Sequence, residues 1–233
     1  MILLLLALLG GLTAERAAAG PWARTPGEVF ATISREIRKG THWDALYAEY
    51  GWGERMTLVL DAGRSASGGW IAISALRVPL WTLGAHRFAA SIGAGIEHVV
   101  YPDMPLDTDP QALIDLGLAP ADYMMLQAGL SWGMSFDSRW GPGWAAVDGT
   151  LRQAVSANRE ERKLDATVGV NLSERRAVFG QMQYSDNRFD SAQIRLGVGW
   201  VEHFGPLAVE AGLGQRILND GEADAKIGLW LTF

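Results

Sequence analysis

The chain has 233 residues, enough for one domain, and its mean hydropathy of +0.05 is too polar for a bundle of membrane-spanning helices. Cysteine is absent, which excludes disulfides, thiolate nucleophiles and cysteine metal ligands. The net charge of −6 argues against nucleic acid as a partner, because such proteins carry basic patches. The 28 glycines and 10 tryptophans suit closely packed strands and a membrane interface, respectively.

The chain opens with an apolar run over residues 2–12, which Ala17, Ala18 and Ala19 follow. An apolar run of this length before small residues is typical of a cleavable secretory signal peptide. No lysine or arginine precedes the run, which departs from the usual pattern, and a short membrane anchor or a buried helix are the alternatives. We expect residues 1–19 to be the signal peptide and residues 20–233 to be one exported barrel domain.

Period-two alternation of apolar and polar residues predicts about twelve β-strands after an opening segment that we expect to be mobile. The predicted strands cover residues 29–37, 43–52, 56–63, 70–78, 87–98, 123–136, 144–152, 164–172, 177–185, 192–202, 207–217 and 225–233. Most of them approach the roughly 9–11 residues of a tilted membrane strand, whereas soluble strands average about 5–6. Every proline is expected outside the strand interiors, since proline cannot donate to the ladder.

The final strand carries the clearest signal of membrane insertion. Its apolar face consists of Ile227, Leu229, Leu231 and Phe233, and the chain stops on that aromatic residue. This ending resembles that of the porin-like class of Gram-negative outer-membrane β-barrel proteins. The resemblance implies an all-β fold, a closed antiparallel up-and-down transmembrane β-barrel, in the bacterial outer membrane. It also implies that these four residues form the signal that the barrel-assembly machinery reads.

Loop lengths and aromatic positions agree with a barrel better than with a soluble β fold. An even number of strands puts both termini on one side, and the longest connection, residues 99–122, then falls on the opposite, external side. Aromatic residues gather near the short periplasmic turns, where rings would meet the headgroups of outer-membrane lipid. They are Tyr50, Trp52, Trp81, Phe88, Phe136, Trp200, Phe204 and Phe233.

If the apolar stripes face lipid, a set of charged residues of both signs must point inward. They are Glu49, Asp61, Arg87, Glu97, Asp148, Arg152, Asp165, Arg195, Glu210, Arg216 and Lys226. This pattern indicates a narrow passive channel for small polar solutes, with these residues lining the pore. The alternative is a closed structural or adhesive barrel, and the sequence leaves both open because lumen width depends on shear as well as strand number.

No catalytic, cofactor-binding or metal-binding residues are expected. The four histidines, His42, His86, His98 and His203, each lie next to a strand end or a turn. Ser91 shares a predicted strand with His98 but faces the other way, so the two cannot form a nucleophile and base pair. The aspartates of the long connection lack the regular ligand spacing of a Ca²⁺ loop. A barrel-embedded hydrolase is therefore the weakest alternative to the channel.

Overall fold

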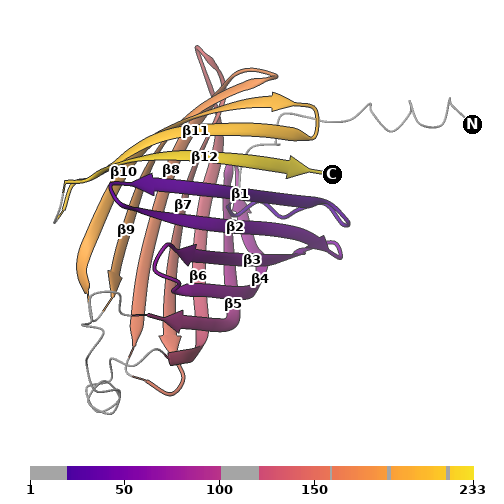
Figure 1. Ribbon diagram of the computed structural model, residues 1–233. Helices are drawn as coiled ribbons and strands as arrows, with labels where there is room; N and C mark the ends of the chain where they lie inside the picture. Colours follow the sequence, from indigo (N-terminus) through magenta and orange to yellow (C-terminus); the bar gives the residue numbers. More distant parts are fainter. Residues whose placement is uncertain (1–19, 101–120, 158, 188–189, 219–220) are drawn as a thin grey trace, which may run out of the picture.

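Twelve antiparallel strands close into a single barrel in the computed structural model, which describes residues 20–100, 121–157, 159–187, 190–218 and 221–233 (Figure 1). The strands are β1 (Val29–Arg38), β2 (Thr41–Trp52), β3 (Met56–Ser65), β4 (Trp70–Leu83), β5 (His86–Val99), β6 (Ala121–Ser138), β7 (Gly141–Ala154), β8 (Glu160–Ser173), β9 (Arg176–Asn187), β10 (Asp190–Phe204), β11 (Leu207–Arg216) and β12 (Ala223–Thr232). Each strand pairs with its neighbours in sequence, and β1 closes the barrel against β12. The predicted fold is confirmed.

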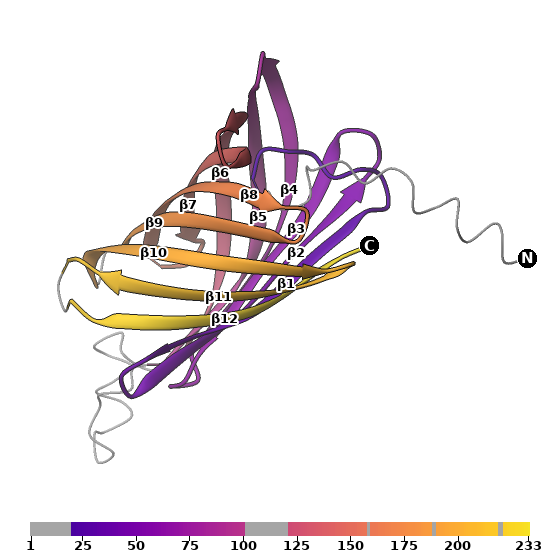
Figure 2. The same cartoon turned by 90° about the horizontal axis from the view of Figure 1, so that it is seen from above.

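The barrel has two unlike rims, which lie at opposite ends of the strands (Figure 2). At the turn rim, connections of two or three residues join β2 to β3, β4 to β5, β6 to β7, β8 to β9 and β10 to β11. Positive φ values at Gly53 (66°), Gly84 (59°) and Gly205 (69°) permit three of these tight reversals. The strands that open and close the barrel also meet here, where the Val29 amide donates to the Phe233 carbonyl at 2.7 Å.

The opposite rim, the loop rim, carries the connection between β5 and β6 that the sequence identifies as the longest. Its residues 101–120 lie outside the described residues, as do the predicted signal peptide at 1–19 and its cleavage site. No helix among the described residues is long and apolar enough to cross a membrane.

The outer face of the barrel is apolar because alternate residues of each strand point outward. Ile92, Leu130 and Leu213 are 70%, 67% and 66% exposed, although they are large hydrophobic side chains. Six of the eight predicted girdle aromatics are likewise exposed, namely Tyr50, Trp52, Trp81, Trp200, Phe204 and Phe233. Phe88 stacks on Trp81 with ring centroids 5.0 Å apart. Such a surface suits contact with lipid and would be unfavourable in water.

Two prolines lie within strands, and the expectation that strand interiors contain no proline is wrong for Pro79. Pro79 lies inside β4, where the register shifts between Pro79 and Trp81. Pro142 is the second residue of β7. Proline has no amide hydrogen to donate. An irregular strand and a strand end both tolerate this loss, whereas a regular ladder in mid-strand does not.

Neighbouring positions on β8 test which face meets lipid. Val168→Arg places a charge on an outward side chain that is 52% exposed, and should lower the free energy of unfolding by roughly 2–4 kcal/mol near the midplane. Thr167→Arg points inward, two residues from Asp165, and should cost much less. Urea unfolding of both variants in lipid vesicles gives the comparison. A larger loss for Thr167→Arg would mean that the assigned faces are reversed.

Candidate solute path inside the barrel

Ion pairs between strands that are not neighbours show which side chains point into the lumen. Arg152 Nη2 on β7 donates to Asp61 Oδ2 on β3 at 2.5 Å. Arg195 on β10 forms a bidentate ion pair with Asp224 on β12, past the intervening β11. In a closed barrel, side chains from separated strands can meet in this way only across the interior.

The Asp61 and Arg152 pair forms the centre of a polar cluster in the lumen. Arg152 also donates to Gln127 Oε1 at 2.8 Å and to Glu161 Oε2 at 3.1 Å, and its side chain is only 3% exposed. The Asp61 side chain is 44% exposed despite pointing inward. Water therefore reaches the lumen wall at the level of Asp61. The guanidinium group of Arg152 is held by three hydrogen-bond partners.

Further charged pairs line the wall on either side of this cluster. Glu97 accepts two hydrogen bonds from Arg159, at 2.7 and 2.9 Å. Lys226 Nζ lies 3.0 Å from Glu210 Oε1. Each of these two acids is held by a base, so the two pairs add charges to the wall that cancel locally.

Glycine makes room for the arginine that crosses β11. A Cβ atom at Gly214 would lie 2.4 Å from Nη2 of Arg195, closer than real atoms pack. The Arg195 side chain therefore lies flat over Gly214 on its way to Asp224. This arrangement narrows the lumen less than an upright side chain would.

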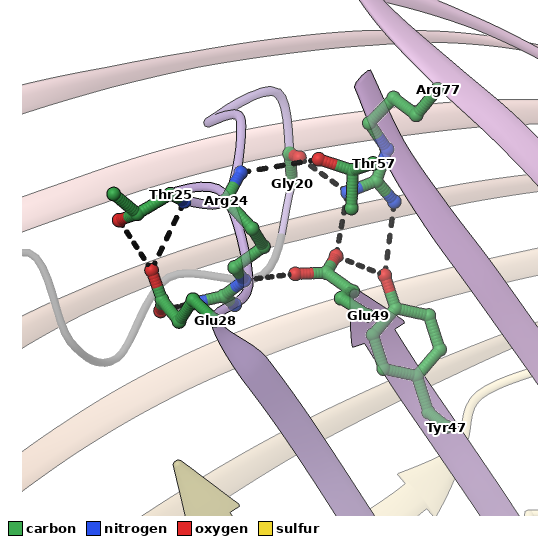
Figure 3. A network of polar contacts seen from close by, with 8 residues as sticks. All are labelled: Gly20, Arg24, Thr25, Glu28, Tyr47, Glu49, Thr57 and Arg77. Atoms are coloured by element: carbon green, nitrogen blue, oxygen red, sulfur yellow. Dashed lines mark hydrogen bonds and ion pairs between the residues drawn. The ribbon is translucent and has the colours of Figure 1, made fainter. Parts of the chain in front are cut away.

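The turn-rim half of the lumen is occupied by residues 20–28, which we call the inner segment (Figure 3). Arg77 Nη1 donates to the Gly20 carbonyl at 2.7 Å and to Glu49 Oε1 at 2.6 Å. Arg24 Nε donates to Glu49 Oε2 at 2.5 Å, so two arginines share one buried carboxylate. Tyr47 Oη donates to the same carboxylate at 2.5 Å. The expectation of a mobile opening is wrong for these residues, because buried ion pairs hold them inside the barrel.

The inner segment passes close to Gly51 of β2 before it continues into β1. The Gly27 amide donates to the Gly51 carbonyl at 2.9 Å, and a Cβ at Gly51 would lie 1.9 Å from the Thr25 carbonyl oxygen. Thr25 donates through its amide and its hydroxyl to Glu28. Burial raises the pKa of the Glu28 carboxyl, but these hydrogen bonds and the charge of Arg24 outweigh it and hold that pKa below its usual value.

An apolar cluster fills the space beside the inner segment. Its buried members, Trp144, Ala177, Val201 and Ala208, are joined by Trp22, Phe179 and Trp230. A Cβ at Gly133 would lie 2.6 Å from the Trp22 ring, so this ring packs directly on the backbone of β6. The lumen is thus constricted toward the turn rim and polar toward the loop rim.

The remaining residues predicted to point inward lie in several surroundings. Asp148 accepts a hydrogen bond from Ser131 Oγ at 2.5 Å and pairs in register with Asp165. Arg216 lies beside Arg195 in the ladder. Arg87 instead donates to the Gly84 carbonyl at 2.8 Å, at the edge of the turn rim, and forms no ion pair with the residues that the structure describes.

Several interior residues were missed by sequence reasoning, namely Arg24, Tyr47, Thr57, Arg77 and Asp224. Arg77 carried a usable signal, since it is the one charged residue in the apolar stretch 70–83 and such a residue requires a partner. Arg24 carried none, because only folding of the inner segment brings it to Glu49.

The histidines form no shared site in the part of the chain that the structure describes. His98 Nδ1 lies 2.7 Å from Asp122 Oδ1, and the His98 ring stacks on Trp70. His86 stacks on Trp132 and accepts its indole hydrogen bond at 3.2 Å. Among the described residues, no group of three or more His, Asp or Glu side chains could hold a metal ion.

Solved outer-membrane β-barrels share this fold. The KdgM porin, in complex with disordered oligogalacturonate, matches with a TM-score of 0.60 and 10% identity, over 88% of this chain and 99% of that one. The NanC porin gives 0.56 and 7%, over 87% and 98%. LpxR from Salmonella typhimurium gives 0.53 and 9%, over 88% and 99%. No protein-family model and no curated protein matches the chain. At these identities the likeness shows the fold, and function must be argued from the lumen.

The Glu49 network should dominate the stability of the turn-rim half. Glu49→Gln leaves Arg24 and Arg77 without their shared carboxylate and should lower the free energy of unfolding by about 3–5 kcal/mol. Glu202→Gln is the control, because its partner Arg176 is exposed and surface pairs contribute about 0–1 kcal/mol. Urea unfolding in detergent measures both, and equal losses would contradict a structural role for the buried network.

Proposed function

We propose that the protein is an outer-membrane barrel whose lumen conducts small polar solutes passively. The observation that supports this function is the Asp61 side chain, which is 44% exposed inside the barrel while it pairs with a buried arginine. Water reaches a charged wall there. With twelve strands, the lumen would be narrower than that of the porins with 16–18 strands. The loop rim would face outward and the turn rim the periplasm.

The balance of interior charges favours a weakly selective channel. The interior acids Asp61, Glu97, Glu210 and Asp224 each pair with an arginine or lysine. The electric fields of paired charges cancel within a few ångströms. A solute would therefore meet hydrogen-bonding groups rather than a strong electric field of one sign. The solved KdgM porin carries an oligogalacturonate, and a polar solute of that general kind would suit such a wall.

A closed structural or adhesive barrel is the second candidate. The inner segment and the apolar cluster around Trp144 support it, because together they fill the turn-rim half of the lumen. We propose no enzymatic activity. The placement of Ser91 and His98 at opposite parity on β5 agrees with that proposal.

Export and assembly are further parts of the proposal. Residues 1–19 would be removed as a signal peptide, leaving Gly20 at the mature terminus. Ile227, Leu229, Leu231 and Phe233 would serve as the assembly signal, and all four side chains lie exposed on the outer face. A partner that reads this strand would find them accessible before the barrel closes.

Conductance in planar bilayers tests the channel. Purified protein should give small, discrete steps. Neutralising Asp61, Glu97 and Asp165 together should shift selectivity toward anions, and high salt should weaken the shift because screening shortens the reach of charges. Glu54→Gln with Glu174→Gln, in exposed turns at the turn rim, is the matched control and should change selectivity little.

The same experiment separates the two candidates. Folded protein that inserts without steps would contradict an open channel. A barrel refolded from residues 25–233, without Arg24, should then conduct if the inner segment acts as a plug. If neither the full barrel nor the shortened one gave conductance steps, the result would support the closed barrel.

Deletion of Phe233 tests the assembly signal. Removal of this residue should lower the yield of folded, heat-modifiable barrel in outer membranes, since the terminal ring and the backbone hydrogen bonds between Phe233 and Val29 would be lost. Phe204→Ala removes a girdle ring that is 60% exposed at the same rim and should reduce the yield less. Equal yields from the wild type and the deletion would argue against a signal at this terminus.

A further inference from the structure

A polar row crosses the outer face of the barrel near the loop rim. Its members are consecutive register partners on β1 to β5, namely Arg35, Asp44, Arg64, Trp70 and His98. One step toward the turn rim lies a second row, which is apolar and consists of Ile33, Leu46, Ala62, Ala72 and Ile96. The two rows are two residues apart along each strand, or roughly 7 Å. This sharp change marks the level at which hydrocarbon would give way to headgroups.

The members of the two rows on β1 to β4 line a groove of about 700 Å³ that runs over β12, β1, β2, β3 and β4. Ala62 and Ala72 have short side chains and form its floor, between the larger Leu46 and Trp70. Ile227 and Leu229 line its β12 side. The volume lies within the range of about 300–1,000 Å³ found for small-molecule sites. Large exposed side chains such as Ile33 and Leu46 border the groove, so the short side chains of Ala62 and Ala72 leave a hollow between them.

Charge at the head of the groove is unbalanced. Arg35 holds Asp44 with two hydrogen bonds, at 2.5 and 2.8 Å. Arg64 is the register partner of Asp44 on the other side, is exposed, and forms no hydrogen bond or ion pair with the described residues. His42 Nε2 also lies near this carboxylate, 3.9 Å from Asp44 Oδ2. Two guanidinium groups and a single carboxylate, which only Arg35 binds, thus lie beside an apolar groove.

We propose that this groove binds one phosphorylated, multiply acylated glycolipid of the outer leaflet. The phosphate would contact Arg64 and Arg35, since guanidinium groups bind phosphate with paired hydrogen bonds. An acyl chain would lie over Ala62 and Ala72. The choice of occupant follows from the charge, because a second copy of this chain would bring the same basic groups to the interface. The choice of leaflet rests on the proposed orientation of the loop rim, whereas the binding itself does not depend on solute conduction.

Native mass spectrometry of the full barrel in neutral detergent, titrated with diphosphoryl lipid A, tests the site. The wild type should retain one lipid. Arg64→Gln should weaken binding by about tenfold or more, the loss expected for a charge-assisted contact. Arg64→Lys should bind with intermediate affinity, because it keeps the charge without the paired donors. Arg162→Gln is the matched control, since Arg162 is also exposed but is paired with Glu160, and it should bind as the wild type does.

Groove shape is tested independently of charge. Ala72→Phe fills the floor and should also weaken binding, whereas Ala128→Phe, at an exposed alanine on β6 that does not line the groove, should not. Lipid A without phosphates should bind the wild type more weakly than the diphosphoryl form. Phosphatidylglycerol that binds equally well would overturn the glycolipid assignment. Unchanged binding in both Arg64→Gln and Ala72→Phe, or a dimer that retains no lipid, would overturn the site. None of these readouts depends on conductance, so failure here and failure of the channel remain distinct.

Discussion

Pairing of β1 with β12 is the constraint on which the rest of the structure depends. This pairing removes the two free edges that a sheet of twelve strands would otherwise expose. In a lipid environment each unpaired backbone group would cost several kcal/mol, so an open sheet would be unstable there. Closure also gives every strand an inside and an outside. The apolar outer surface and the charged interior follow from that division, because successive side chains must alternate between the two.

Inside the barrel, glycines leave the space that long side chains and the inner segment occupy. Gly214 allows Arg195 to reach Asp224, and Gly51 allows the inner segment to pass close to β2. Buried charges are tolerated where hydrogen-bond partners hold them. Glu49, at 1% exposure, is the clearest case, since it receives hydrogen bonds from two arginines and a tyrosine. A single arginine could not have compensated for the desolvation of this carboxylate as well.

The likeness to the KdgM and NanC porins lies in the arrangement of strands, at 10% and 7% identity. The lumen must therefore be understood from its own residues. Its two halves suit different tasks. The half near the loop rim is wetted and charged, whereas the other half is packed by Trp22 and its apolar neighbours. A channel in this protein would be controlled at the inner segment.

Alternation along the sequence was enough to predict about twelve antiparallel strands in chain order, and the facing of most of them. Alternation is a local property, and Leu130 or Ile92 reports its side of the sheet without knowledge of any distant residue. The register that places Pro79 at an irregularity, and the entry of Arg24 into the lumen, were decided only in the tertiary structure. These features depend on contacts between residues that are far apart in the chain, such as Arg152 with Asp61. Local patterns carry no information about such partners, because many partners of opposite charge would satisfy the same arginine.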